Sequence, residues 1–220
     1  MWLWMLACVP DRDLLALPAR FEASPAALTL EDGGTATLEQ ATWTIGSLRL
    51  ESPASSTQDT GSALLRHLSP ISVAHAHPGH ESAGGVLGEL LGEWELDLLS
   101  DQDLGTLQLY EGELATGRLE LAGTLRLQGV AELDGALHPF DLAVESDAEV
   151  TGLPLEAQVV STDPPSALVL SLDPAHALSW VDLSADSDDD GLLTAADDGV
   201  ENSFSFGALS TPTYSLTLEP

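Results

Sequence analysis

The stretch that decides the fold is GTLQLYEGELATGRLELAGTLRLQGVAEL, residues 105–133. Leucines recur at every second position in much of it, with polar residues between them, as at Leu107 and Leu109 and again at Leu125 and Leu127. Successive side chains of a β-strand point to opposite faces of a sheet, so this alternation predicts strands with one buried and one solvated face. Leucine is a mediocre strand former, but the strict alternation and the scarcity of i, i+3, i+4 apolar stripes favour strands over helices.

The same pattern extends over most of the chain. Predicted strands cover residues 27–31, 35–39, 41–51, 94–99, 105–111, 117–123, 123–133, 139–145, 155–160, 167–173, 203–207 and 214–219. Asp32-Gly33-Gly34 and Asp134-Gly135 are hairpin-turn signals, and Gly46-Ser47 shifts the alternation as a β-bulge would. Residues 61–71 and 84–93 are interpreted as short helical turns or irregular structure. The expected fold is all-β, an antiparallel β-sandwich of the Ig-like or transthyretin-like type.

Composition narrows the classes of partner. The chain has 220 residues, of which 44% are hydrophobic, so it can bury a substantial core. With 36 acidic and 6 basic residues its formal net charge is −30, which disfavours nucleic acid and anionic lipid surfaces and favours divalent cations. Solubility or adaptation to a salty environment is the alternative reason for this charge. The single cysteine, Cys8, excludes an intramolecular disulfide.

The N-terminal residues MWLWMLACVPDRD, 1–13, are an apolar run that ends in a small residue followed by Cys8. This resembles the end of a bacterial lipoprotein signal, although the run is short and no basic segment precedes it. We therefore expect Cys8 to be lipidated, residues 1–20 to be a signal remnant and tether, and residues 21–220 to form a single domain. Membrane contact would be by the lipid anchor alone, because no later segment has the ~20 apolar residues of a span.

The most specific motif is DSDDDGLLTAAD, residues 186–197, here called the acidic loop. It matches an EF-hand-type calcium loop, in which alternate carboxylates converge on one cation and a glycine permits the sharp turn. The predicted ligands are the carboxylates of Asp186, Asp188, Asp190 and Asp197, the backbone carbonyl of Leu192 and the hydroxyl of Thr194. Aspartate replaces the usual final glutamate, which weakens calcium and helps magnesium. The alternative is an acidic surface turn.

A second candidate site is VAHAHPGH, residues 73–80, near the end of a long connection over residues 52–88. His75 and His77 project to one side of an extended segment, and the turn at Pro78-Gly79 can return His80 toward them. Three imidazoles predict a Cu²⁺ or Zn²⁺ site. The alternatives are a pH-sensitive or partner-contacting loop and an ordinary solvated loop. The two isolated histidines, His138 and His176, are interpreted as structural.

Three features of the sequence, taken together, resemble a known type of bacterial protein. They are the MLAC N-terminus, the AHAHPGH loop before the GEWELDLL…GTLQLYEGELATGRLEL block, and the late calcium-type loop. The combination is similar to uncharacterised bacterial surface or periplasmic β-sandwich lipoproteins, some of them associated with copper handling. The resemblance implies an exported protein of the cell envelope that is associated with metals and is not an enzyme.

The sequence carries no Gly-x-Ser-x-Gly, phosphate loop or His-Glu-x-x-His, so no enzymatic activity is expected. The predicted function is an exported, periplasmic or outer-surface lipoprotein that binds a structural Ca²⁺ in the acidic loop and a Cu²⁺ or Zn²⁺ ion in the histidine loop. The alternative is a calcium-stabilised surface adhesion or structural module in which the histidines have no metal role.

Overall fold

A computed structural model describes residues 14–31, 33–53, 85–160 and 165–220. Its strands are β1 (Leu14–Glu22), β2 (Ala27–Thr29), β3 (Thr35–Glu51), β4 (Val86–Leu90), β5 (Trp94–Asp97), β6 (Gln102–Tyr110), β7 (Gly112–Leu133), β8 (Ala136–Ser146), β9 (Glu149–Val160), β10 (Ala167–Leu172), β11 (Leu193–Thr194) and β12 (Tyr214–Glu219). The helices are α2 (Pro174–Leu178), α3 (Val200–Ala208) and the 3-10 turn η1 (Thr211–Thr213). The all-β class is therefore confirmed.

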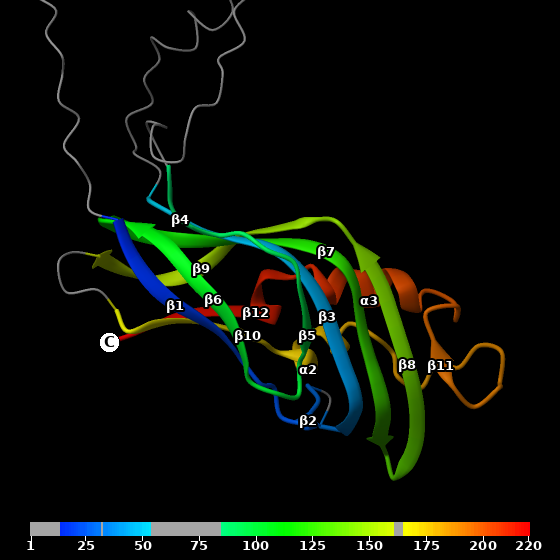
Figure 1. Ribbon diagram of the computed structural model, residues 1–220. Helices are drawn as coiled ribbons and strands as arrows, with labels where there is room; N and C mark the ends of the chain where they lie inside the picture. The colour runs from blue at the N-terminus through cyan, green and yellow to red at the C-terminus, as the bar shows by residue number, and fades with distance from the viewer. Residues whose placement is uncertain (1–13, 32, 54–84, 161–164) are drawn as a thin grey trace, which may run out of the picture.

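All the described strands belong to one sheet, shown in Figure 1. Its main order is β11-β8-β7-β3-β4-β6-β1-β10-β12, while β2 and β5 also pair with β3, and β9 also pairs with β7. The pairs β1–β10 and β11–β8 are parallel, so the expectation of a wholly antiparallel sheet is wrong. The Ig-like or transthyretin-like sandwich is not confirmed, since the described strands do not form two separate sheets.

Two long strands organise the sheet. The first part of β7, residues 112–120, pairs with β9, and the second part, residues 123–133, pairs with β8, while β3 lies along the other edge of both. Between Ile45 and Leu48 the register of β3 against β7 shifts, which confirms the predicted bulge at Gly46-Ser47. The sheet coils enough for β12 to contact β9 (Figure 1). Strong coiling is expected where bulges interrupt long twisted strands.

Alternating leucines form the core, as the sequence predicts. Leu107, Leu109, Leu119 and Leu127 are completely buried. Burying one such side chain stabilises the fold by about 1.5–3 kcal/mol, so the repeated pattern is the main favourable contribution. The Trp43 ring lies in the same core and meets the Tyr214 ring edge-on, with ring centroids 5.4 Å apart.

Three segments differ from expectation. Residues 203–207, predicted as a strand, lie in α3, where Phe204 is buried and Phe206 is 59% exposed. Part of the 84–93 segment, predicted as helical or irregular, is β4. Residues 14–20, predicted as part of the tether, lie in β1, which buries Leu17 and Ala19 in the core.

The two α-helices of the described residues, α2 and α3, lie in the C-terminal part of the chain and precede the last strand. Asp173 caps α2 by accepting hydrogen bonds from the backbone N–H groups of Ala175 and His176. Helix α3 packs against α2 and β8, and in Figure 1 it crosses behind β7 and β8. The Tyr214 hydroxyl at the start of β12 donates to the carbonyl of Ala208 at the end of α3. These contacts fix both ends of the segment that carries the acidic loop.

Candidate metal centre

The acidic loop is held against the sheet by a short strand. Its residues Leu193 and Thr194 form β11, which pairs in parallel with Phe140 and Asp141 of β8. Leu193 is 2% exposed and belongs to the hydrophobic core, so it anchors the loop to the body of the protein. Gly191 has φ +87°, in the left-handed region that glycine adopts without a Cβ penalty. The turn that the motif requires is thus present.

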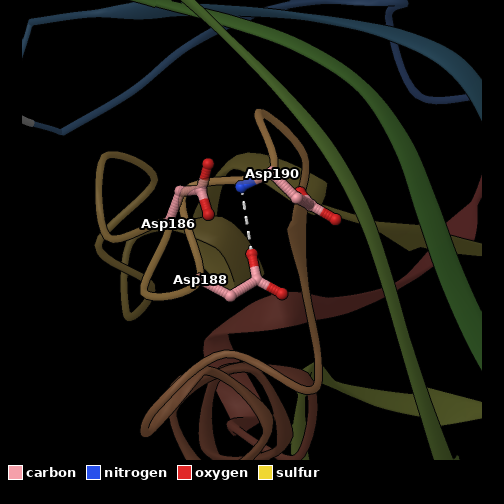
Figure 2. A group of neighbouring side chains, drawn as sticks. All are labelled: Asp186, Asp188 and Asp190. Atoms are coloured by element: carbon pink, nitrogen blue, oxygen red, sulfur yellow. Dashed lines mark hydrogen bonds between the residues drawn. The ribbon is translucent and has the colours of Figure 1, made fainter.

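Figure 2 shows the three carboxylates that this turn gathers, Asp186, Asp188 and Asp190, here called the acidic triad. One oxygen from each lies within 4.8 Å of the others. Each side chain also accepts a backbone hydrogen bond from within the loop. Gly191 N donates to Asp186 at 2.7 Å, Asp190 N donates to Asp188 at 3.2 Å, and Leu192 N donates to Asp190 at 2.8 Å.

One oxygen of the triad lacks a partner. Oδ1 of Asp186 is buried and has no hydrogen-bond partner among the described residues, while its Oδ2 accepts from Gly191 N. Leaving a buried carboxylate oxygen unsatisfied is costly, and the cost is relieved by a cation or a donor. The position of this oxygen beside two further carboxylates favours a cation.

The triad is electrostatically strained. The hydrogen bond from Asp190 N lowers the pKa of Asp188. Partial desolvation, a side-chain hydrogen-bonding interaction with Asp186 and the negative charges of Asp190 and Asp197 outweigh it, so the pKa of Asp188 is raised. Like charges held close together disfavour the ionised form. A divalent cation would remove this repulsion.

Asp197, the predicted last ligand, closes the loop. Its Oδ1 accepts from the N–H and hydroxyl of Ser187 at 2.8 and 2.9 Å, and its Oδ2 accepts from the N–H and hydroxyl of Thr194 at 2.7 and 3.3 Å. The bonds from Thr194 N and Ser187 N lower the pKa of Asp197 to about 2. Both oxygens of Asp197 therefore accept hydrogen bonds within the loop, and Asp197 is not in the group of three converging carboxylates.

The remaining predicted ligands fall into two groups. The Thr194 hydroxyl donates to Asp197 and accepts from Ala196 N. Leu192, whose carbonyl is the predicted ligand, donates its N–H to Asp190 within the loop. The other predicted site residues, His75, His77, His80 and Cys8, lie outside the described residues.

Sequence reasoning missed Ser187. Besides its two bonds to Asp197, its hydroxyl accepts from Asp198 N, so it joins the start of the loop to its end. A serine beside the first aspartate of the motif was the available signal, because short hydroxyl side chains commonly bond to nearby loop groups.

A scan against protein-family models, a search of curated proteins and a search of solved structures each found no match. Among the residues that the structure describes, no helix is both long enough and apolar enough to span a membrane.

Proposed function

We propose that the acidic loop binds one divalent cation of the Ca²⁺ type. This proposal rests on Oδ1 of Asp186, which is buried beside the carboxylates of Asp188 and Asp190 and has no hydrogen-bond partner in the described part of the chain. Oxygen ligands surround Ca²⁺ at about 2.3–2.6 Å, so two of them on opposite sides of the ion lie roughly 5 Å apart. The spread of up to 4.8 Å within the triad suits a shared ion.

The donor set favours a hard cation over a transition metal. The triad offers only carboxylate oxygens, which suit Ca²⁺, Mg²⁺ and Mn²⁺, whereas Cu²⁺ and Zn²⁺ prefer sites with imidazole or thiolate. The loop has extra oxygens available in its backbone carbonyls, which Ca²⁺ uses readily. Mg²⁺ demands near-ideal octahedral geometry and is the weaker candidate.

The role of the ion would be structural. The loop lies between α2 and α3, and Leu193 attaches it to β8. Neutralising the triad would therefore stabilise the connection that leads to α3 and β12.

The calcium proposal is tested by thermal melting with and without 10 mM Ca²⁺. An affinity of about 10⁻⁴–10⁻³ M would stabilise the protein by about 1.4–2.7 kcal/mol. For a chain of this size that raises Tm by roughly 3–10 °C. Asp188→Asn should abolish most of the rise.

Asp189→Asn is the matched control, because Asp189 is in the same loop but outside the triad. Its φ of +57° is a conformation that asparagine tolerates well. Equal increases in Tm for the two variants, or no increase for the wild type, would overturn the proposal.

At the level of the whole protein we propose an exported lipoprotein of the bacterial cell envelope, anchored through Cys8, that binds Ca²⁺ in the acidic loop and Cu²⁺ or Zn²⁺ through His75, His77 and His80. The sequence features described above support this proposal, together with the net charge of −30. The test titrates Cu²⁺ and Zn²⁺ into the wild type and into a triple alanine variant of the three histidines.

A large loss of affinity in the triple variant is expected. Equal and weak binding by both proteins, with the Ca²⁺ response retained, would instead favour the calcium-stabilised adhesion or structural module. Anchoring is tested separately, because Cys8→Ser should move the protein out of the membrane fraction of its native cells.

A further inference from the structure

A cleft of about 490 Å³ opens on another part of the molecule. It lies between the segment after β2, the β7–β8 hairpin and the segment that follows α2. Its volume falls within the range of about 300–1,000 Å³ of small-molecule sites. No residue of the acidic triad lines it, so it is distinct from the proposed cation site. We call it the hairpin cleft.

Apolar residues form much of its lining. Leu30, Leu178, Val181 and Leu183 line the cleft and are 1–8% exposed, because they also belong to the hydrophobic core. Side chains held by a packed core keep their positions when a ligand arrives, so this surface is preformed. It would contact an apolar body and would not suit a fully hydrated ion.

Three carboxylates also line the cleft, and each comes from a different segment: Glu31 after β2, Asp134 in the β7–β8 turn and Asp182 after α2. None of the ion pairs between described residues joins one of them to an arginine. Glu31 has a histidine neighbour, with His176 Nδ1 3.6 Å from its Oε1. The cleft is therefore acidic and uncompensated by a permanent cation from the described residues.

Asp182 is held in its charged form. Its Oδ1 accepts from the hydroxyl and the N–H of Ser184 at 2.6 and 3.0 Å. These bonds lower the pKa of Asp182, and His138, which also lines the cleft, lowers it further. A carboxylate that is ionised at neutral pH is thus fixed at the edge of an apolar surface.

These groups do not suit a metal ion. Among the described residues, only the acidic triad brings three ligand atoms of His, Cys, Asp or Glu within 4.8 Å of one another. The carboxylates of the hairpin cleft are too widely spaced to share one ion. Separated negative charges around an apolar surface instead fit a larger ligand that carries its positive charge on an organic frame.

We propose that the hairpin cleft binds a small organic cation, in which an ammonium or guanidinium group is joined to an apolar body. The apolar body contacts Leu178 and Val181, and the charged group faces Glu31 and Asp182. Anions are repelled by the same carboxylates, and neutral analogues lose the electrostatic contribution.

The experiment measures binding of tryptamine by isothermal titration calorimetry in 0.15 M NaCl, with tryptophol as the neutral analogue. Saturable binding of tryptamine and at least about tenfold weaker binding of tryptophol are expected. The double variant Glu31→Gln/Asp182→Asn should lose about tenfold in affinity for tryptamine. The control Glu113→Gln/Asp147→Asn removes the same charge from exposed positions outside the cleft and should stay within about twofold of the wild type.

A second variant tests the cleft without changing charge. Ala136 lines it and is exposed, so Ala136→Trp should fill the space and abolish tryptamine binding while the fold is kept. Asp188→Asn should bind tryptamine like the wild type, which separates this proposal from the calcium proposal. The proposal is overturned if tryptamine does not saturate the wild type, if the two double variants bind equally, or if Ala136→Trp retains full affinity.

Discussion

Replacing Gly129 with alanine should destabilise the protein severely, because of where this glycine lies in the sheet. Gly129 is in β7 opposite Leu38 of β3, next to a register shift between Leu38 and Gln40. A Cβ at this position would lie 2.1 Å from the carbonyl oxygen of Thr37 and 3.1 Å from the Cα of Leu38. The obstacles are backbone atoms of β3, which cannot rotate away as a side chain could.

The magnitude follows from this geometry. The Cβ–oxygen contact is roughly 1 Å shorter than van der Waals contact allows, so β3 and β7 must separate locally. Overpacking of this kind costs about 1–3 kcal/mol, and backbone obstacles place the cost at the upper end. Alanine also lowers the conformational entropy of the unfolded chain, which stabilises the folded state by about 0.4–1 kcal/mol. The expected net loss is about 2–2.6 kcal/mol, or roughly 4–10 °C in Tm.

The assay is urea denaturation followed by tryptophan fluorescence, with Gly46→Ala as the matched control. Gly46 is in β3, and a Cβ there would meet only side-chain atoms of Ala122 and Glu120, at 3.3–3.5 Å. Gly46→Ala should therefore change the free energy of unfolding by less than about 1 kcal/mol. Equal stability of the two variants would refute the reasoning about backbone crowding at Gly129.

Three further predictions concern the C-terminal part of the chain. Gly207→Ala would place a Cβ 2.3 Å from the carbonyl oxygen of Ala177, so it should separate α3 from α2 and lower Tm, as measured by calorimetry. Tyr214→Phe removes the 2.6 Å hydrogen bond to the carbonyl of Ala208 and should cost about 1–2 kcal/mol in urea denaturation, whereas an unchanged midpoint would contradict it. The folded-state pKa of Asp197 is lowered to about 2. Its contribution to the free energy of unfolding is therefore present above the ordinary pKa of 3.8 and is lost as pH falls toward 2. Acid denaturation of the wild type should therefore include a step in this window, and Asp197→Asn should lack it.

Much of the fold could be predicted from the alternation of leucines. The hairpin at Asp134-Gly135 is present, with Leu133 opposite Ala136, and both turn residues have positive φ. Such turns depend on local backbone preferences, so a short stretch of sequence determines them.

Predictions were wrong where local pattern and tertiary contacts disagree. In SFSFG, residues 203–207, the alternating phenylalanines suggested a strand, but α3 buries Val200, Phe204 and Ala208 on one helical face. Val200 and Ala208 lie outside the quoted stretch, and this helical face is buried because α2 and β8 cover it. The parallel pairing of β1 with β10 was likewise invisible, since it joins segments at opposite ends of the chain.

The acidic loop shows the same division. Its sequence determined the turn and the convergence of three carboxylates, because spacing and the glycine act over a few residues. Only the tertiary structure decided that Leu193 is buried against β8 and that Oδ1 of Asp186 is buried with no hydrogen-bond partner among the described residues. The hairpin cleft, assembled from three distant segments, could not be read from the sequence at all. The conformation of a turn depends on the residues within it, so a short sequence determines it. Burial depends on which distant atoms the folded sheet brings near.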